Sequence, residues 1–457
     1  MSGPTSHRTN VHEVGIEDVF FSTTDRRGII EHANRLFVTF SRFPREALVG
    51  SPHNIIRHPD MPSGVFSVMW TELLAGRPFA GHVDNLAADG STYSVYATVT
   101  PLSNGGFLSV RIRPMDSSHS SAARDLYQTL NSFEDELRRA GLGRRGVAAR
   151  SAQRLGELLA AAGYDSYAAF QRQTLPGEIA KFERRSETLP TRPEASGDLA
   201  VMLSTTNQVD RALSSWSMQQ RHLATLSESL QRVGTELQRD LDATSKTIDR
   251  ITEITATVQA PPSLLEPLRI WAQMQGLIQG YIVELIRALQ ELDENSAENR
   301  FRVALAKLHT RMMASFVVEL IDADTVSSAS MQADAIALLS QTLHSGLIEM
   351  AEHSRAHREL TARTVTSIEK SASVLTIPRK LLLSWQAQSA ATQLSPAMRQ
   401  LAGEVTASIT KVGSTLEELN RIIKLCDTIG DGDDPATLLQ LITQIEDAIR
   451  PFAEASS

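Results

Sequence analysis

Residues Gly50–Trp70 read G-S-P-H-N-I-I-R-H-P-D-M-P-S-G-V-F-S-V-M-W, the most informative stretch of this 457-residue chain. Its first part holds two histidines, one arginine, one aspartate and three prolines, and its second part predicts a helix that contains aromatic residues. Each proline fixes its own φ and restricts the residue before it. The polar side chains therefore stand on a stiff frame, which is typical of a segment that holds a ligand; they are His53, Asn54, Arg57, His58 and Asp60.

Short alternating runs on both sides of this loop predict strands. Residues 20–34 predict two strands joined by a turn, and Asp89-Gly90 is the strongest hairpin signal in the chain. Residues 105–114 close the sheet. Strands at both ends with short helices between them predict an α+β domain on an antiparallel sheet. The two sides of the strand after Gly90 are Tyr93, Val95, Ala97 and Val99, and Ser94, Tyr96, Thr98 and Thr100.

From about residue 116 the pattern becomes helical. Helices are predicted over 125–140 and 148–162, and a bend containing two prolines and a glycine follows at 189–197. Beyond the bend, apolar residues recur every seven positions, the pattern of a coiled coil whose partner helix belongs to the same chain or to another. The series is Met202, Val209, Trp216, Leu223, Leu230, Leu237, Thr244, Ile251 and Val258.

Prolines punctuate the rest of the chain. Pro261-Pro262 ends the coiled-coil helix, a break is predicted at Ile377-Pro378, and Asp434 is the predicted N-cap of the last helix. Together these helices predict an antiparallel all-α bundle. Their predicted ranges are 263–292, 297–321, 328–373, one through Trp385, one from 395–396 and one after 434–435.

Composition narrows the classes of function and location. The net charge of −8 argues against a nucleic-acid-binding body, which needs a concentrated basic surface. Cys426 is the single cysteine, so no intrachain disulfide can form. The N-terminus lacks the apolar core of a signal peptide, and polar residues interrupt the most apolar window, 270–292. These features predict a soluble, cytoplasmic protein without a membrane span.

The run P-H-N-I-I-R-H-P-D-M-P at 52–62 resembles a hallmark of the flavin-binding PAS domain of bacterial aerotaxis receptors. The resemblance extends to S-T-T-D at 22–25, H-A-N at 32–34 and G-F-L-S-V-R at 106–111. It implies a PAS fold over about residues 20–115 that binds FAD and senses redox state, oxygen or energy. On this basis we predict three parts, which are a PAS sensor domain at 1–115, a helical linker at 116–196 and a helical bundle with a coiled-coil segment at 197–457.

Seven residues are the predicted cofactor-binding set. From the residues alone, the loop can also be purely structural, with side chains that cap a helix and pair with one another. The resemblance favours FAD, because it aligns the loop with one implicated in FAD binding. The set is Arg57, His58, Asp60 and His53 in the loop, Trp70 lining the pocket, and Asn34 and Asn85 in the cofactor cavity.

The chain also departs from the family pattern. Beside Asn85, residues 84–89 read D-N-L-A-A-D, where the family carries several basic residues. Tyr93-Ser94 stands for an aromatic pair, and residues 78–81 read P-F-A-G for P-W-S-G. Neither the membrane anchor nor the E-A-A-R-A-G-E-type tip of such receptors is found. A pocket that binds FAD, haem or no cofactor therefore stays open.

The function predicted from these features is a non-enzymatic signal-transduction sensor that relays the state of its PAS domain to the helices. It acts on a protein signalling partner, forms a homodimer and is linked to chemotaxis. The alternative is a scaffold or dimerisation protein whose PAS domain is empty or binds haem. No motif supports catalysis or a metal centre: His353 and His357 have metal-ligand spacing but charged neighbours, residues 427–434 read as a turn, and Cys426 reads as a packed residue.

Overall fold

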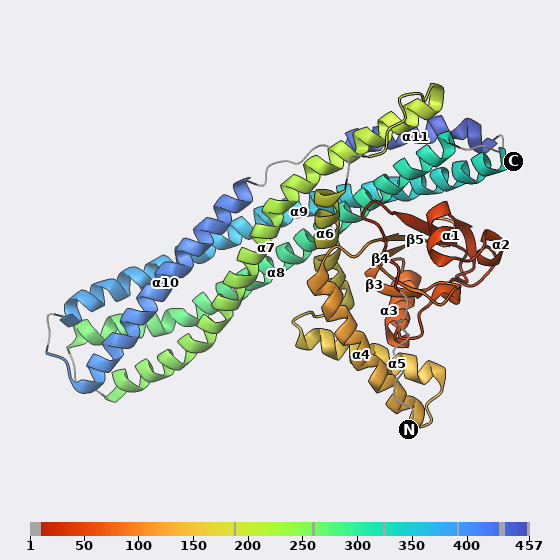
Figure 1. Ribbon diagram of the computed structural model, residues 1–457. Helices are drawn as coiled ribbons and strands as arrows, with labels where there is room; N and C mark the ends of the chain where they lie inside the picture. The colour runs from red at the N-terminus through yellow and green to blue at the C-terminus, as the bar shows by residue number, and fades with distance from the viewer. Residues whose placement is uncertain are drawn as a thin grey trace. The chain divides into compact units, whose positions relative to one another are not determined.

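The computed structural model describes residues 11–186, 189–257, 261–322, 326–390, 393–428 and 435–454. The N-terminal part is a five-stranded antiparallel sheet with the spatial order β2-β1-β5-β4-β3 (Figure 1). This confirms the predicted α+β class. The strands are β1 (Phe20–Thr24), β2 (Ile30–Ala33), β3 (Phe79–Leu86), β4 (Thr92–Pro101) and β5 (Phe107–Ile112).

Short helices between β2 and β3 cover one face of the sheet, which we call the inner face. They are α1 (Arg35–Ser41), α2 (Arg45–Leu48), the 3-10 helix η1 (His53–Ile56) and α3 (Ser63–Leu74). The alternation of β4 directs Tyr93, Val95 and Ala97 to this face, where they join one apolar cluster with side chains of α1, α2 and η1. Asn34 caps α1, because its Oδ1 accepts from the backbone N–H of Phe37 at 3.0 Å.

The opposite, outer face of the sheet is also buried. Phe21, Tyr96 and Val110 point to this side and pack in one cluster with residues of α6 (Tyr167–Arg185) and of the long helices. Tyr96 is fully buried, and its hydroxyl lies 3.0 Å from Oγ1 of Thr174 on α6. A polar-looking strand side is therefore part of the core.

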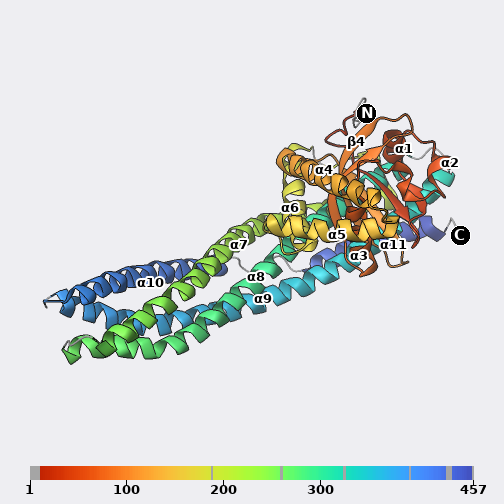
Figure 2. The same cartoon turned by 90° about the horizontal axis from the view of Figure 1, so that it is seen from below.

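Two more helices, α4 (Ser117–Arg139) and α5 (Arg144–Ala161), lie against α3 (Figure 2). They overlap the helices predicted at 125–140 and 148–162. The approach of α3 to α5 requires a glycine, because a Cβ on Gly64 would lie 2.3 Å from Oγ of Ser151 and 2.5 Å from the carbonyl carbon of Ser151. The start of α3 is thus held against a helix outside the PAS domain.

The remaining helices are long and belong to two compact units. The first unit holds residues 1–217, 300–350 and 433–457, and the second holds 218–299 and 351–432. The boundaries predicted from the sequence, at 115 and 196, stay predictions. The helices are α7 (Gly197–Thr257), α8 (Pro262–Ile321), α9 (Val326–Ala390), α10 (Pro396–Thr428) and α11 (Pro435–Glu454).

The seven-residue series on α7 is buried within the single chain. Met202, Val209 and Trp216 belong to the core of the first unit, and Leu223, Leu230 and Leu237 to that of the second. Their partners are side chains of α8, α9 and other helices of the same chain. The seam therefore has an intramolecular partner. The side chain of Thr244 and residue Val258 lie outside the described residues.

Two predicted interruptions are wrong. Helix α9 runs through Pro378, where a break was expected, and α8 runs through 292–297 without a gap. A proline removes one backbone hydrogen bond, but a long helix keeps its course where the turns on both sides are packed. Leu375 and Leu382 are both buried on the same helix, one turn to each side of Pro378. Packing thus outweighs the local signal.

The structure also describes His357 and Cys426, which the sequence placed on a solvated face and in a packed helix. His357 is 8% exposed, and its Nδ1 lies 3.0 Å from Oδ1 of Asn295, so the expected solvated face is wrong at that position. Cys426 is buried in the core of the second unit. Asp434 and the turn at 429–434 lie outside the described residues. Among the described helices, none has the length and apolar character needed to cross a bilayer.

Candidate functional site

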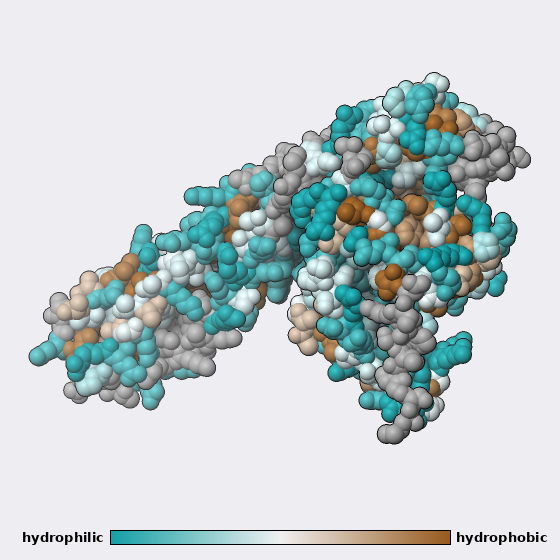
Figure 3. All heavy atoms as spheres, in the orientation of Figure 1, coloured by the Kyte–Doolittle hydropathy of each residue, from teal (hydrophilic) through white to brown (hydrophobic). Residues whose placement is uncertain are grey.

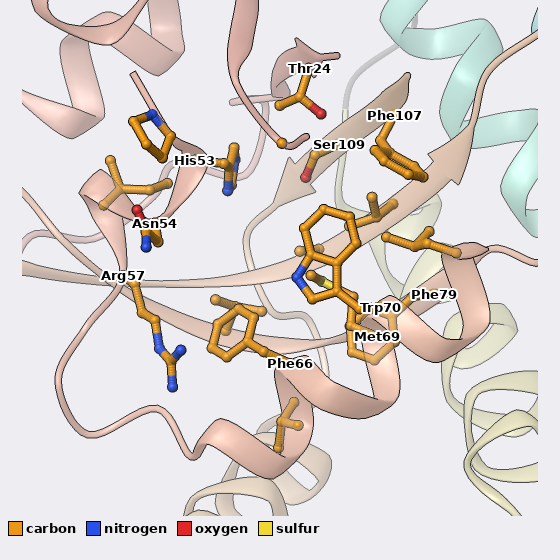
Figure 4. A pocket seen from close by; sticks show the side chains of 18 of the residues that line it. Thr24, His53, Asn54, Arg57, Phe66, Met69, Trp70, Phe79, Phe107 and Ser109 are labelled. Atoms are coloured by element: carbon orange, nitrogen blue, oxygen red, sulfur yellow. The ribbon is translucent and has the colours of Figure 1, made fainter. Parts of the chain in front are cut away.

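A cavity of about 410 Å³ lies between the inner face of the sheet, η1 and α3. The size falls in the range of small-molecule sites in proteins, about 300–1,000 Å³. Figure 4 shows its two sides, with His53, Asn54 and Arg57 on one and Trp70, Phe79 and Phe107 on the other. Four of the seven predicted binding residues line this cavity, namely His53, Arg57, Trp70 and Asn85.

The apolar wall consists of aromatic and sulfur-containing side chains. Trp70 on α3 meets Phe107 on β5 edge to face, with ring centroids 5.3 Å apart and planes at 82°. Gly28 lets the indole approach the backbone, because it has φ +78° and a Cβ there would lie 3.2 Å from the Trp70 ring. Phe66, Met69 and other residues complete a wall suited to a flat ring system.

Asn85 supplies an unpaired polar group to this cavity. It lies on β3, is 3% exposed, and its Nδ2 has no hydrogen-bond partner among the described residues. A buried amide without a partner costs about 1–3 kcal/mol. Its backbone forms an antiparallel bridge with Arg57, so the stiff loop is tied to β3 at this point. A ligand with a hydrogen-bond acceptor would satisfy the amide.

Arg111 on β5 places a buried guanidinium in the same cavity, and it was not among the predicted site residues. It is 2% exposed, and it donates to Oγ of Ser22 at 3.2 Å and to the carbonyl oxygen of Ser109 at 3.3 Å. Its third neighbour is Nε2 of His53. These partners are all neutral when His53 is unprotonated. The charge of Arg111 is therefore available to an acceptor in the cavity.

Burial controls the charge of these two groups. Desolvation lowers the pKa of Arg111 to about 10, which leaves the guanidinium charged at neutral pH. Desolvation, and then the charge of Arg111, lowers the pKa of His53 to about 3. His53 is therefore neutral and accepts from Arg111. One sequence signal existed for Arg111, since Phe107, Ser109 and Arg111 alternate along one side of β5.

Arg57 occupies the edge of the cavity. It donates to the carbonyl oxygen of Met61 at 2.7 Å, and its guanidinium carbon lies 4.1 Å from the ring centroid of Phe66. Partial burial lowers its pKa. The stiff loop is thus braced by its own backbone and by α3, and the remaining N–H groups of Arg57 are the loop's charged donors nearest the cavity.

The other three predicted residues lie outside the cavity lining. His58 is fully buried, and its Nδ1 accepts from the backbone N–H of Asp60 at 3.1 Å. The Asp60 carboxylate lies 3.8 Å from the same nitrogen and is half-exposed. Oδ1 of Asn34 also accepts from the backbone N–H of Phe21 at 3.2 Å. These contacts shape the loop and β1, and direct binding by these residues stays a prediction.

The helices after the PAS domain hold this loop and the end of the sheet from outside. On α4, the buried carboxylate of Glu134 accepts from the backbone N–H of Gly64 at 3.1 Å and pairs with Arg138 at 2.7 Å. On α6, the buried carboxylate of Glu178 accepts from the backbone N–H of Met115 at 2.6 Å. The segment that leads into α3 and the C-terminal end of the domain are therefore each held by a buried carboxylate.

Residues 17–115 match the PAS fold family, so this chain carries a PAS domain. Over 120 residues, or 25% of the chain, it is 38% identical to the aerotaxis receptor of Escherichia coli (strain K12) and covers 24% of that protein. It is 30% identical over 86 residues to the nitrogen fixation regulatory protein of Klebsiella pneumoniae, covering 19% of this chain and 17% of that one. The chain thus spans a quarter or less of these relatives.

Solved structures are also similar to part of this chain. A PAS domain from Colwellia psychrerythraea is 21% identical, with a TM-score of 0.18, and covers 21% of this chain and 85% of its own. The Rhodobacter sphaeroides LOV protein is 16% identical, with a TM-score of 0.21, and covers 37% of this chain and 94% of its own. The PAS assignment rests on the family match and on the aerotaxis receptor.

Proposed function

We propose that this protein is a non-enzymatic sensor whose PAS cavity binds the flavin of FAD and whose helices carry the signal. The observation that supports this most is the pairing of an aromatic wall with the Nδ2 of Asn85, which has no partner among the described residues, in one cavity. A flavin ring has the matching character, since it is flat, with one apolar edge and one edge of carbonyl oxygens and nitrogens. Bound there, it would supply reversible redox chemistry.

The residues of the cavity divide the work of binding. Trp70 and Phe107 offer flat apolar surface, and Asn85 offers a donor at the polar end. Arg111 offers a buried positive charge, which favours a ligand oxygen that carries or gains negative charge. Arg57 stands at the edge, where the phosphate groups of a dinucleotide would extend, and it supplies part of the basic character that residues 84–89 lack.

In this proposal, strands β5 and β1 transmit a structural change in the cavity to the helices. Arg111 faces the cavity, while its neighbours Val110 and Ile112 face the helices on the other side. There, Phe21 meets Phe316 of α8 with ring centroids 4.0 Å apart. A ligand that changes the hydrogen bonds of Arg111 would shift a packed interface, and only such a state-dependent contact can bias the helices.

Absorption spectroscopy of the purified full chain tests this proposal. Flavin bands that disappear on chemical reduction support it, and Asn85→Leu and Arg111→Leu should lose the flavin. Ser94→Ala is the matched control, because Ser94 is exposed on the neighbouring strand β4 and does not line the cavity. A spectrum without flavin bands, unchanged after incubation with free FAD, contradicts the proposal.

The second candidate is a scaffold whose PAS domain binds haem or no ligand. A Soret band, or no chromophore together with unaltered partner binding in the cavity variants, would favour it.

In the sensor proposal, the protein is cytoplasmic and forms a homodimer. A protein partner, as in chemotaxis, binds the helices and responds to their state. Light scattering on the oxidised and reduced protein measures whether assembly follows the redox state.

A further inference from the structure

The turn between α4 and α5 carries a concentrated positive charge that the PAS cavity does not use. Residues 137–156 contain six arginines and no aspartate or glutamate, in a chain whose net charge is −8. They are Arg138, Arg139, Arg144, Arg145, Arg150 and Arg154. We call this segment the arginine tip. The segment is positively charged in a chain that is negatively charged overall, and a local positive charge of this kind favours an anionic partner.

The arginine tip is open to solvent along its whole turn. Every residue from 138 to 146 is exposed, and so is Arg150. Arg138 and Arg154 form ion pairs with carboxylates of their own helices. Arg139 donates to the backbone carbonyl of Asp135. The charges of Arg139, Arg144, Arg145 and Arg150 are thus held out to solvent.

One apolar side chain stands in the middle of the tip. Leu142 is 37% exposed and lies between Gly141 and Gly143 at the point where the chain turns. The tip is the end of a helical hairpin, a projecting shape rather than a groove (Figures 1 and 2). On the face shown in Figure 3, hydrophilic and apolar residues are interspersed over α4 and α5. A projecting end suits a flat partner surface.

The arginines and the exposed leucine of the tip favour lipid headgroups over nucleic acids as the anionic partner. Clusters of four to eight Lys or Arg residues bind anionic lipid headgroups, and an exposed leucine adds insertion into the interface. Single-stranded nucleic acids are bound by basic residues interleaved with aromatic rings, and residues 137–156 contain no aromatic residue. We propose that the arginine tip docks this protein reversibly on the surface of a membrane rich in anionic phospholipids.

Rigid attachment would make this docking relevant to the PAS domain. Glu134 of α4 holds the N-terminus of α3, and Asn131 of α4 donates to the carbonyl oxygen of Asp60 in the stiff loop. The tip lies at the far end of the same helix, α4, beyond Glu134. Docking would therefore keep the PAS cavity close to the lipid surface. This proposal stands whether or not the cavity binds FAD.

Vesicle cosedimentation of the full chain tests the proposal. The vesicles contain equal parts of phosphatidylglycerol and phosphatidylcholine, or phosphatidylcholine alone, in 0.1 M salt. We expect binding to the first and not to the second, and loss of binding at 0.5 M salt, where charges are screened over a few ångströms. Equal binding to both vesicles, or to neither, overturns the proposal.

Amino-acid substitutions test whether the arginine tip is the part of the protein that binds the vesicles. R139Q/R144Q/R145Q/R150Q should weaken the partition constant by about 600-fold, since each of the four arginines near an anionic surface contributes about fivefold. R287Q/R355Q/R358Q/R399Q makes the same change of charge at exposed positions of the second unit and should leave binding unchanged. Leu142→Ala should weaken it severalfold. Equal losses in both quadruple variants would show a mere net-charge effect and overturn the proposal.

Binding to nucleic acids is measured as well, because their phosphates are the other anionic ligand considered for the tip. A DNA duplex and a single-stranded RNA of about 20 nucleotides are titrated at the same salt concentration. Weak binding that the tip variant does not alter agrees with the lipid proposal. Binding of either nucleic acid that exceeds binding to the vesicles, and that the tip variant abolishes, assigns the tip to nucleic acid instead and overturns the lipid proposal.

Discussion

The inner and outer faces of the PAS sheet are both buried, but they are filled in different ways. The inner face leaves a cavity of about 410 Å³ in which Nδ2 of Asn85 lacks a hydrogen-bond partner among the described residues and Arg111 donates to the neutral oxygens of Ser22 and Ser109. The outer face is filled by interlocking apolar side chains, such as Phe21 against Phe316. An unfilled polar face suits a ligand, whereas a close-packed face transmits displacement. The same five strands thus present a receiving surface and a transmitting surface.

The largest expected difference between the two faces lies in their response to loss of a ring. Phe316→Ala on the outer side should lower the free energy of unfolding by about 3–5 kcal/mol, because it opens a cavity in a packed core. Phe66→Ala, on the cavity side, should cost about 1–2 kcal/mol, since its ring borders space that already exists. Urea unfolding measures both, and equal costs would contradict the distinction.

Acidification below neutral pH should destabilise the outer face through the titration of His309. Nε2 of His309 lies 3.4 Å from Oγ1 of Thr100. Burial lowers the pKa of His309 from 6.5 to about 4. The unfolded chain therefore binds the proton more readily, so stability is full above pH 6.5 and falls as the pH decreases toward 4. At pH 5, the loss from His309 is about 2 kcal/mol.

The control for this pH effect is His309→Asn. Wild type and variant share His53 and His357, whose pKa values burial also lowers, so their difference isolates His309. Urea unfolding at pH 7 and pH 5 should show a smaller decrease for the variant. An identical decrease in both proteins would place the pH sensitivity elsewhere.

The clamp at the end of β5 should have an intermediate effect. Glu178→Gln replaces a buried carboxylate that accepts from the N–H groups of Met115 and Asp116 with a neutral amide. Charge-assisted hydrogen bonds are stronger than neutral ones, so we expect a loss of about 1–2 kcal/mol. Hydrogen exchange at Met115 and Asp116 should rise more than exchange in β2. Glu136→Gln, at an exposed position of α4, is the control.

The smallest change in stability is expected at the cavity, and it has the opposite sign. Asn85→Leu should stabilise the ligand-free protein by up to about 1 kcal/mol, because it removes a buried Nδ2 that has no partner among the described residues. The same variant should lose FAD binding. Thermal unfolding without FAD and titration with FAD measure the two effects. Destabilisation without FAD would mean that the amide has a structural partner.

Part of the site could be predicted because its signals are local. The prolines of the loop and the spacing of its polar residues indicated a stiff ligand-holding segment, and His53 and Arg57 of this loop do line the cavity. Trp70 and Asn85 line it as well, but they were predicted from the family resemblance. Arg111 was missed because an arginine in a strand is ordinarily exposed. Its burial depends on Phe37 and His53, which come from elements more than fifty residues earlier in the chain.

The sequence by itself determined the strands of the PAS domain, the stiff loop and the apolar seam of α7, because alternation, proline and the seven-residue period act over a few neighbouring residues. Only the tertiary structure decided that Tyr96 and Phe21 are covered, that Pro378 leaves α9 continuous, and that the seam of α7 packs within its own chain. Those outcomes depend on burial against segments distant in the sequence, and burial outweighs the preference of any single residue.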